Sequence, residues 1–164
     1  MKKTISLILV LVLTVGLLAG CGKEEVTISL WPEYADLSWA DNMVVEPEEP
    51  PYNLGGWLYE DYVSWYLELP AKDTYTLRFY YSMPGEYDTC TGAVVFTDEE
   101  GEEYEQLVEF MPTSDPGSWD TYDWVETEME LPKGLGSLTM TAWEMPENQE
   151  YFLNLRLIQI YTGD

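Results

Sequence analysis

The stretch Glu60-Asp-Tyr-Val-Ser-Trp-Tyr-Leu-Glu-Leu-Pro-Ala-Lys-Asp-Thr-Tyr-Thr-Leu-Arg-Phe-Tyr-Tyr-Ser82 contains two runs in which apolar and polar residues alternate. The apolar positions of these runs are Val63, Trp65, Leu67 and Leu69, then Tyr75, Leu77, Phe79 and Tyr81. Successive side chains of a β-strand point to opposite faces. Each run is therefore predicted to be a strand with one buried face.

Similar runs continue along the rest of the chain. We expect further strands near residues 92–97, 104–110, 123–131, 137–143 and 152–161, with Gly, Pro, Asp or Asn in every gap. No segment shows a sustained period of 3.6 residues, so helices are expected to be single turns at most. Eight or nine strands joined by turns predict an all-β protein, an antiparallel β-sandwich of the jelly-roll kind.

The first twenty residues have the organisation of an export signal. Lys2 and Lys3 precede an apolar run that ends at Leu18, and the small residues Ala19 and Gly20 follow. The alternative, a transmembrane helix, needs about 20 apolar residues and the run is shorter. We expect residues 1–20 to be a cleaved signal peptide.

The residues at the end of this segment, Leu18-Ala-Gly-Cys21, resemble a lipobox. The resemblance implies that Cys21 carries a lipid. The few residues before the first strand-like run predict a short tether over residues 21–25. The remaining length is typical of one domain, so residues 26–164 are expected to form a single β-sandwich domain. The lipobox resemblance also implies a location at the extracytoplasmic face of a bacterial cell membrane.

The charge of the chain limits its partners. After cleavage, 5 basic and 31 acidic residues remain, a formal charge of −26. Such a chain has no basic surface with which to neutralise phosphates, so nucleic acid is excluded as a partner. Neutral polymers, cations and basic proteins remain.

The residue types restrict the available chemistry. The chain has no histidine, which excludes Ser-His-Asp and His-metal sites, and no cofactor is predicted. If Cys21 is lipidated, Cys90 has no partner for a disulfide. Some of the 31 carboxylates always fall at the spacing that glycoside hydrolysis needs. A small sandwich without a large insertion offers no deep cleft, however, and we expect no enzyme.

The opening stretch, residues 60–82, resembles the pattern Gly-Asp-Trp-Val-x-Tyr-x-Val-x-Val-Pro of carbohydrate-binding modules of families 6 and 35. Gly117-Ser-Trp-Asp-Thr-Tyr122, Leu131-Pro-Lys-Gly134 and Phe152-Leu-Asn-Leu-Arg-Leu-Ile158 are similar to later motifs of these families, in the same order. The resemblance covers roughly residues 26–161 and implies a galactose-binding-domain-like jelly roll.

Two positions depart from the family pattern. Asp73 stands where the family has glycine, and Arg156 stands where the family has an aspartate that helps to hold a structural calcium ion. Glu33 is the nearest candidate for another ligand of that ion. Since Arg156 places a cation among the expected ligands, no metal is assigned.

Four residues are candidates for ligand contact. Trp119 lies among turn-forming residues, and the resemblance gives it a stacking role; the alternative is a lid over the core. Asn154 is the hydrogen-bonding asparagine that the resemblance implies, or else a strand-end residue bonded to local backbone. Trp57 and Tyr59 follow Gly55-Gly56 and are candidates for an opposing ring, although one or both could be core residues.

The acidic segment from Asp98 to Glu103 has two interpretations. Convergent carboxylates attract calcium, but the spacing does not match a calcium-binding loop of the EF-hand type. A hairpin turn with Gly101 at a position of positive φ explains the segment more simply.

Together these patterns predict a lipid-anchored, non-catalytic carbohydrate-binding module that holds a neutral oligosaccharide or polysaccharide by aromatic stacking and hydrogen bonding. The alternative is a structural or interaction lipoprotein without a sugar site. Its acidic surface would bind a basic protein or a cell-wall component. Exposed and convergent loop aromatics would favour the first function.

Overall fold

The computed structural model describes residues 26–38, 40, 42–147 and 149–162, which form ten strands and one short 3-10 helix. The predicted signal peptide, Cys21 and the tether lie outside these residues. None of the described residues belongs to a helix long and apolar enough to cross a membrane. The elements are β1 (Thr27–Leu30), η1 (Pro32–Tyr34), β2 (Val44–Glu46), β3 (Asn53–Gly55), β4 (Tyr62–Leu69), β5 (Asp73–Ser82), β6 (Cys90–Asp98), β7 (Glu103–Phe110), β8 (Asp123–Leu131), β9 (Gly134–Glu144) and β10 (Asn154–Tyr161).

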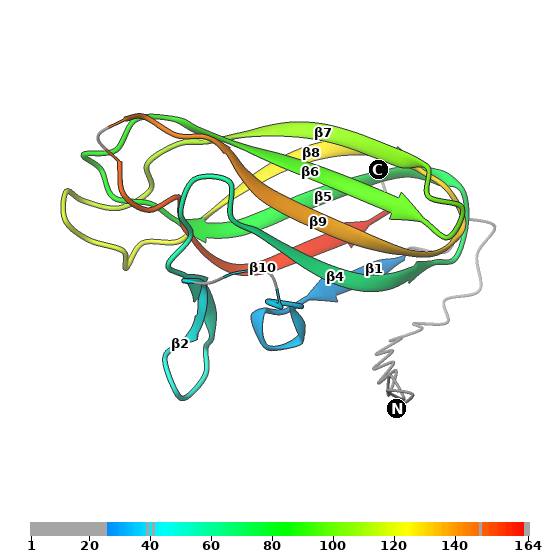
Figure 1. Cartoon of the computed structure of the whole chain (residues 1–164), viewed down its shortest axis with the longest axis horizontal. Helices are drawn as coiled ribbons and strands as arrows, with labels where there is room; N and C mark the ends of the chain where they lie inside the picture. Colours follow the sequence, from blue (N-terminus) through cyan, green and yellow to red (C-terminus); the bar gives the residue numbers. More distant parts are fainter. Residues whose placement is uncertain (1–25, 39, 41, 148, 163–164) are drawn as a thin grey trace, which may run out of the picture.

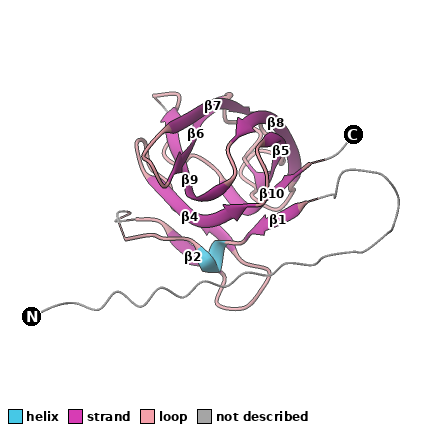
Figure 2. Cartoon of the chain, turned by 90° about the vertical axis from the view of Figure 1, so that its right-hand side faces the viewer, coloured by secondary structure: helices cyan, strands magenta, loops and turns pink. Residues whose placement is uncertain are grey.

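The strands form two antiparallel sheets that pack face to face (Figures 1 and 2). One sheet has the order β2-β3-β10-β5-β8, with β1 also beside β10, and the other has the order β4-β9-β6-β7. The predicted antiparallel β-sandwich is therefore confirmed. Val26 and Thr162 exchange hydrogen bonds, so the described chain begins and ends side by side.

The core fills the space between the sheets with the alternating residues that the sequence indicated. All eight apolar positions of the opening stretch are buried, from Val63 in β4 to Tyr81 in β5. Aromatic rings dominate one end of the core, where Phe110 packs edge-on against Phe79, Tyr81 and Phe152. This burial of large apolar side chains is the main favourable term in the stability of the sandwich.

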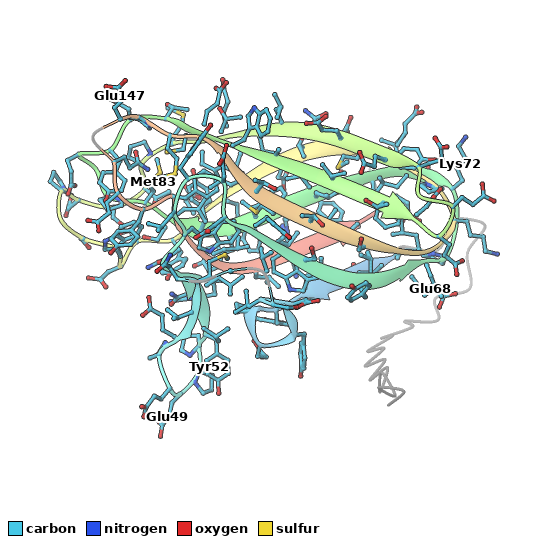
Figure 3. The ribbon with its side chains drawn as sticks, viewed as in Figure 1. Glu49, Tyr52, Glu68, Lys72, Met83 and Glu147 are labelled. Atoms are coloured by element: carbon cyan, nitrogen blue, oxygen red, sulfur yellow. The ribbon has the colours of Figure 1, made fainter. Side chains whose placement is uncertain are left out.

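A hairpin formed by β2 and β3 projects from the body of the sandwich (Figure 1). The clustered prolines of residues 46–51 indicate a loop, because proline cannot donate a hydrogen bond to a strand partner. The structure confirms a turn region after Glu46 but adds two three-residue strands that pair Val44 with Gly55 and Glu46 with Asn53. Figure 3 shows Glu49 and Tyr52 on this projection. Strands this short carry too few residues to show an alternating pattern.

β10 contains a β-bulge that the sequence analysis missed. Leu155 pairs with Tyr81 and Leu157 pairs with Tyr80, which leaves Arg156 without a partner on β5. A bulge inserts one extra residue and shifts the alternation of faces. Leu155 and Ile158 consequently both face the core, although they are three residues apart.

The acidic segment between β6 and β7 is a hairpin turn, as expected. Gly101 has a φ of 84°, and the carboxylate of Asp98 accepts hydrogen bonds from the backbone N–H groups of Glu100 and Glu102. The Asp98 carboxylate therefore caps the turn, and the neighbouring glutamates are exposed.

Trp57 was a candidate for ligand contact, and the structure contradicts this prediction. Its side chain is 0% exposed and packs against Phe152, with ring centroids 5.7 Å apart. Leu54 and Trp57 insert into the same core, so no face of the indole reaches solvent. Among the described residues, its Nε1–H has no hydrogen-bond partner.

Trp57→Ala is expected to lower the free energy of unfolding by about 3–5 kcal/mol because it leaves a large cavity. Trp57→Phe should cost clearly less, since it keeps an aromatic ring and removes an unpartnered N–H group. Urea denaturation measures both values. If the two variants lost the same free energy of unfolding, the packing of the Trp57 ring in the core would be contradicted.

Candidate ligand-binding site

A cavity of about 250 Å³ opens between the β2–β3 hairpin, the start of β10 and the loop before β8. Its walls come from these three parts of the chain and include Glu46, Asn53, Trp119, Tyr122, Asn154 and Arg156. We call it the hairpin pocket. It lies beside the end of the sandwich where the loops 83–89, 111–122 and 149–153 gather (Figure 1).

Hydrogen bonds fix the loop that carries Trp119. The buried hydroxyl of Ser114 contacts that of Ser82 and accepts a hydrogen bond from the N–H of Thr121. The backbone N–H groups of Thr113 and Ser114 both donate to the carbonyl oxygen of Met83, which Figure 3 labels at this end of the sandwich. These bonds close the loop at its base and hold Trp119 over the pocket.

The ring of Trp119 is half-buried. It packs edge-on against Tyr87, with ring centroids 5.7 Å apart and planes at 86°. Trp119 is therefore neither a core residue nor a free side chain. Such a supported ring loses little conformational freedom when a ligand binds.

Gly55 allows two polar side chains to meet at the floor of the pocket. A Cβ atom at this position would lie 2.5 Å from Oε1 of Glu46 and 2.9 Å from Oδ1 of Asn154. Glu46 also accepts a hydrogen bond from the Asn53 amide at 3.4 Å. The absence of a side chain at Gly55 thus brings two acceptor oxygens together beside the cavity.

Arg156 and Tyr122 also line the pocket, next to Asn154. The guanidinium carbon lies 3.7 Å from the centroid of the Tyr122 ring, a cation–π contact. Burial raises the pKa of Tyr122 above its ordinary value; Arg156 and Asn154 oppose this rise, and Glu46 adds to it. The phenol therefore stays protonated at neutral pH and can donate a hydrogen bond.

The lining of the pocket is polar but not balanced in charge. Glu46 and Asp120 contribute two carboxylates, and Arg156 contributes the one cation among the lining residues. No carboxylate of the described residues is in ion-pair contact with Arg156, whose Nε is buried without a hydrogen-bond partner. The guanidinium donates a hydrogen bond to the Tyr122 hydroxyl, and a guanidinium has five N–H donors, more than this one contact uses.

The structure brings together two of the four predicted site residues, Trp119 and Asn154, which both line the hairpin pocket. Tyr59 is 59% exposed but does not line it. The next residue, Glu60, donates its N–H to Ala142 of β9, which directs this loop toward the other sheet. Trp57 is in the core.

Sequence reasoning missed Glu46, Tyr122 and Arg156 as lining residues. Arg156 carried a signal, because apolar residues occupy positions 153, 155 and 157 and then 158 and 160, a change of parity typical of a bulge. The sequence around Glu46 gave no such signal, because Glu46 lines the pocket only as a result of the pairing of β2 with β3.

A structural calcium ion does not fit the family position in this chain. Arg156, at the place of the family aspartate, holds its guanidinium against Tyr122. Among the described residues, no three Asp, Glu or Cys side chains gather closely enough to hold a metal ion. Glu33 is an exposed residue of η1.

The fold is similar to those of several solved carbohydrate-binding modules. A family 35 module from Clostridium thermocellum has 16% sequence identity and a TM-score of 0.66, with 84% of this chain and 99% of that chain covered. The family 6 module of Cellvibrio mixtus lichenase 5A, in complex with cellotriose, has 16% identity and a TM-score of 0.59, with 84% and 98% covered.

A further similar structure is a family 35 module in complex with a disaccharide that contains glucuronic acid, with 15% identity, a TM-score of 0.64, and 84% and 94% of the two chains covered. No protein-family model and no curated protein matches the chain. The resemblance to families 6 and 35 is therefore confirmed at the level of the fold.

Calcium is expected to leave the melting temperature unchanged. A site filled at 100 times its Kd would add about 2.7 kcal/mol, which in a domain of this size raises the melting temperature by several degrees. Differential scanning calorimetry with and without millimolar calcium measures this. A rise that Glu33→Gln abolishes would show that the family site is present after all.

Proposed function

We propose that this chain is a non-catalytic carbohydrate-binding module that holds a neutral glycan in the hairpin pocket, and that a lipid on Cys21 keeps it at the extracytoplasmic face of a bacterial membrane. One observation carries the proposal for the pocket. Trp119 and Asn154, which lie 35 positions apart in the sequence and which the resemblance assigns to stacking and to hydrogen bonding, line the same cavity.

The pocket has the chemistry that a sugar requires. The face of an indole ring packs against the polarised C–H groups of a pyranose. The hydroxyl groups of the sugar both donate and accept hydrogen bonds, and the pocket offers acceptors on Glu46 and Asn154 and donors on Arg156. A cavity lined by both acceptors and donors suits a ligand whose hydroxyl groups do both.

The charges of the pocket support a neutral ligand. Among the similar structures, one holds cellotriose and another a disaccharide that contains glucuronic acid. In this chain, Glu46 and Asp120 line the cavity and the whole sequence has a formal charge of −24. A sugar carboxylate would meet two like charges and one opposite charge.

The alternative function is an interaction lipoprotein whose acidic surface binds a basic protein or a cell-wall component. A protein with this function would not need aromatic side chains that are exposed and point into one cavity. Trp119 is half-buried at the wall of an open cavity, with Tyr122 in the same lining. This arrangement favours the glycan over the alternative.

Trp119→Ala should abolish detectable glycan binding and leave the fold intact. Modules that stack one or two sugars bind with about −4 to −6 kcal/mol, and loss of the ring should remove about 1–3 kcal/mol of this. A broad glycan array identifies the ligand, and isothermal titration compares the variant with the wild type.

Trp143→Ala is the matched control, because Trp143 is 49% exposed on β9, in the other sheet, and does not line the pocket. Gly55→Ala tests the pocket floor without removing a ring, since it displaces the ends of Glu46 and Asn154. No binding by the wild type to any glycan on the array, together with a large drop in melting temperature for Trp119→Ala, would favour the interaction lipoprotein.

Cys21→Ala tests the proposed anchor. The variant should lose lipid attachment and leave unprocessed or soluble protein, because the cysteine sulfur is the atom that accepts the lipid. Metabolic labelling with a fatty acid measures the modification. Labelling of the variant equal to that of the wild type would contradict the lipid anchor and leave the pocket proposal unaffected.

A further inference from the structure

A continuous row of side chains lies on the outer face of the six-stranded sheet. Tyr75, Leu77, Phe79 and Tyr81 of β5 face the core, so Arg78 and Tyr80 face outward, and the same alternation turns Trp124 of β8 and Tyr161 of β10 outward. We call the set the aromatic–arginine row: Arg156, Tyr122, Tyr80, Trp124, Arg78 and Tyr161.

Each member of the row contacts the next. Beyond the Arg156–Tyr122 contact, the ring centroid of Tyr80 lies 5.4 Å from that of Tyr122 and 4.6 Å from that of Trp124. The guanidinium carbon of Arg78 lies 4.5 Å from the Trp124 centroid and 5.3 Å from the Tyr161 centroid. The row is therefore an ordered surface rather than a set of separate exposed residues.

The row begins inside the hairpin pocket. Arg156 and Tyr122 line the pocket, and Tyr80, which contacts Tyr122, is the first member beyond it. From Asp123, the residue after Tyr122, to Glu126, which accepts a hydrogen bond from the Tyr161 hydroxyl, β8 extends over about 10 Å at ~3.4 Å per residue. This length exceeds that of one sugar ring.

The pocket itself is too small for a polymer. Its volume of about 250 Å³ is below the range of roughly 300–1,000 Å³ that encloses a drug-sized ligand. It suits a single small unit such as one sugar. A longer glycan that places one unit in the pocket must lay its neighbouring units on the adjoining surface.

The row offers hydrogen-bond donors to such units. It contains both arginines of a chain that has 31 acidic residues, and within the described residues neither arginine forms an ion pair. The Nε–H of Arg78 donates to Gln159, which orients the guanidinium and leaves its terminal N–H groups available. Trp124 is 38% exposed, and its indole contacts both Tyr80 and Arg78.

We propose that the aromatic–arginine row extends the binding site, so that the pocket holds one sugar unit and the row holds the following units of the same chain. The inference rests on the proposed function and narrows it: the ligand is a stretch of a polysaccharide rather than an isolated mono- or disaccharide. Tyr122 and Arg156 belong to both the pocket and the row, so the two surfaces are continuous. This continuity is the reason to place one glycan chain across both.

The test uses cello-, xylo-, manno- and malto-oligosaccharides of two and six units, titrated by calorimetry into the wild type, Trp124→Ala and Arg78→Gln. In the series that binds, the six-unit sugar should bind the wild type about tenfold more tightly than the two-unit sugar, because linked contacts act together. Each variant should reduce the six-unit affinity to about that of the two-unit sugar, with two-unit binding unchanged. Trp143→Ala should retain the full difference.

Equal affinity of the wild type for the two lengths would overturn the extended site and leave the pocket proposal standing. The extended site would also be overturned if Trp124→Ala lowered the affinities for the two-unit and six-unit sugars by the same factor and kept the wild-type melting temperature. In that case Trp124 would affect binding in the pocket alone. If no glycan of any length binds, the proposed function fails and the extended site fails with it.

Discussion

The bulge at Arg156 is the constraint on which the site depends. β10 lies between β5 on one side and β1 and β3 on the other, so its inward side chains belong to the core and its outward ones to the sheet surface. In a regular strand, Leu155 and Ile158 would face opposite sides. One unpaired residue lets both enter the core. The polar residues Asn154 and Arg156 can therefore line the pocket while the hydrophobic packing on both sides of the bulge is complete.

The other walls of the pocket are held by different means. The loop with Trp119 is tied at its base through Ser114 and the carbonyl oxygen of Met83, whereas the hairpin wall depends on Gly55, which leaves room for Glu46 and Asn154. Both walls consist of short segments attached to a large core. A rigid sandwich with variable attachments can change its ligand without a change of fold.

The sequence predicted the long strands well because their alternation is strong: the boundaries of β4 and β5 differ from the expected runs by one or two residues. It placed Trp119 and Asn154 in the site only through the resemblance to known modules. Trp57 and Tyr59 show the limit of local reasoning, since both follow the same pair of glycines and one is in the core while the other is exposed. Nothing in a short segment indicates which of two neighbouring rings the core will accept.

The meeting of Val26 and Thr162, the ends of the described residues, also bears on how the proposed anchor would present the domain. Val26 and Thr162 meet at the far end of β10 from Asn154, and seven residue steps at ~3.4 Å separate the two ends of this strand by about 24 Å. The Debye length at physiological ionic strength is about 8 Å. Under the proposed lipid anchor on Cys21, whose tether would join the sandwich at Val26, the pocket would lie up to about three screening lengths further than Val26 from an anionic lipid surface. At that distance the charge of the surface would no longer affect which ligand the pocket receives.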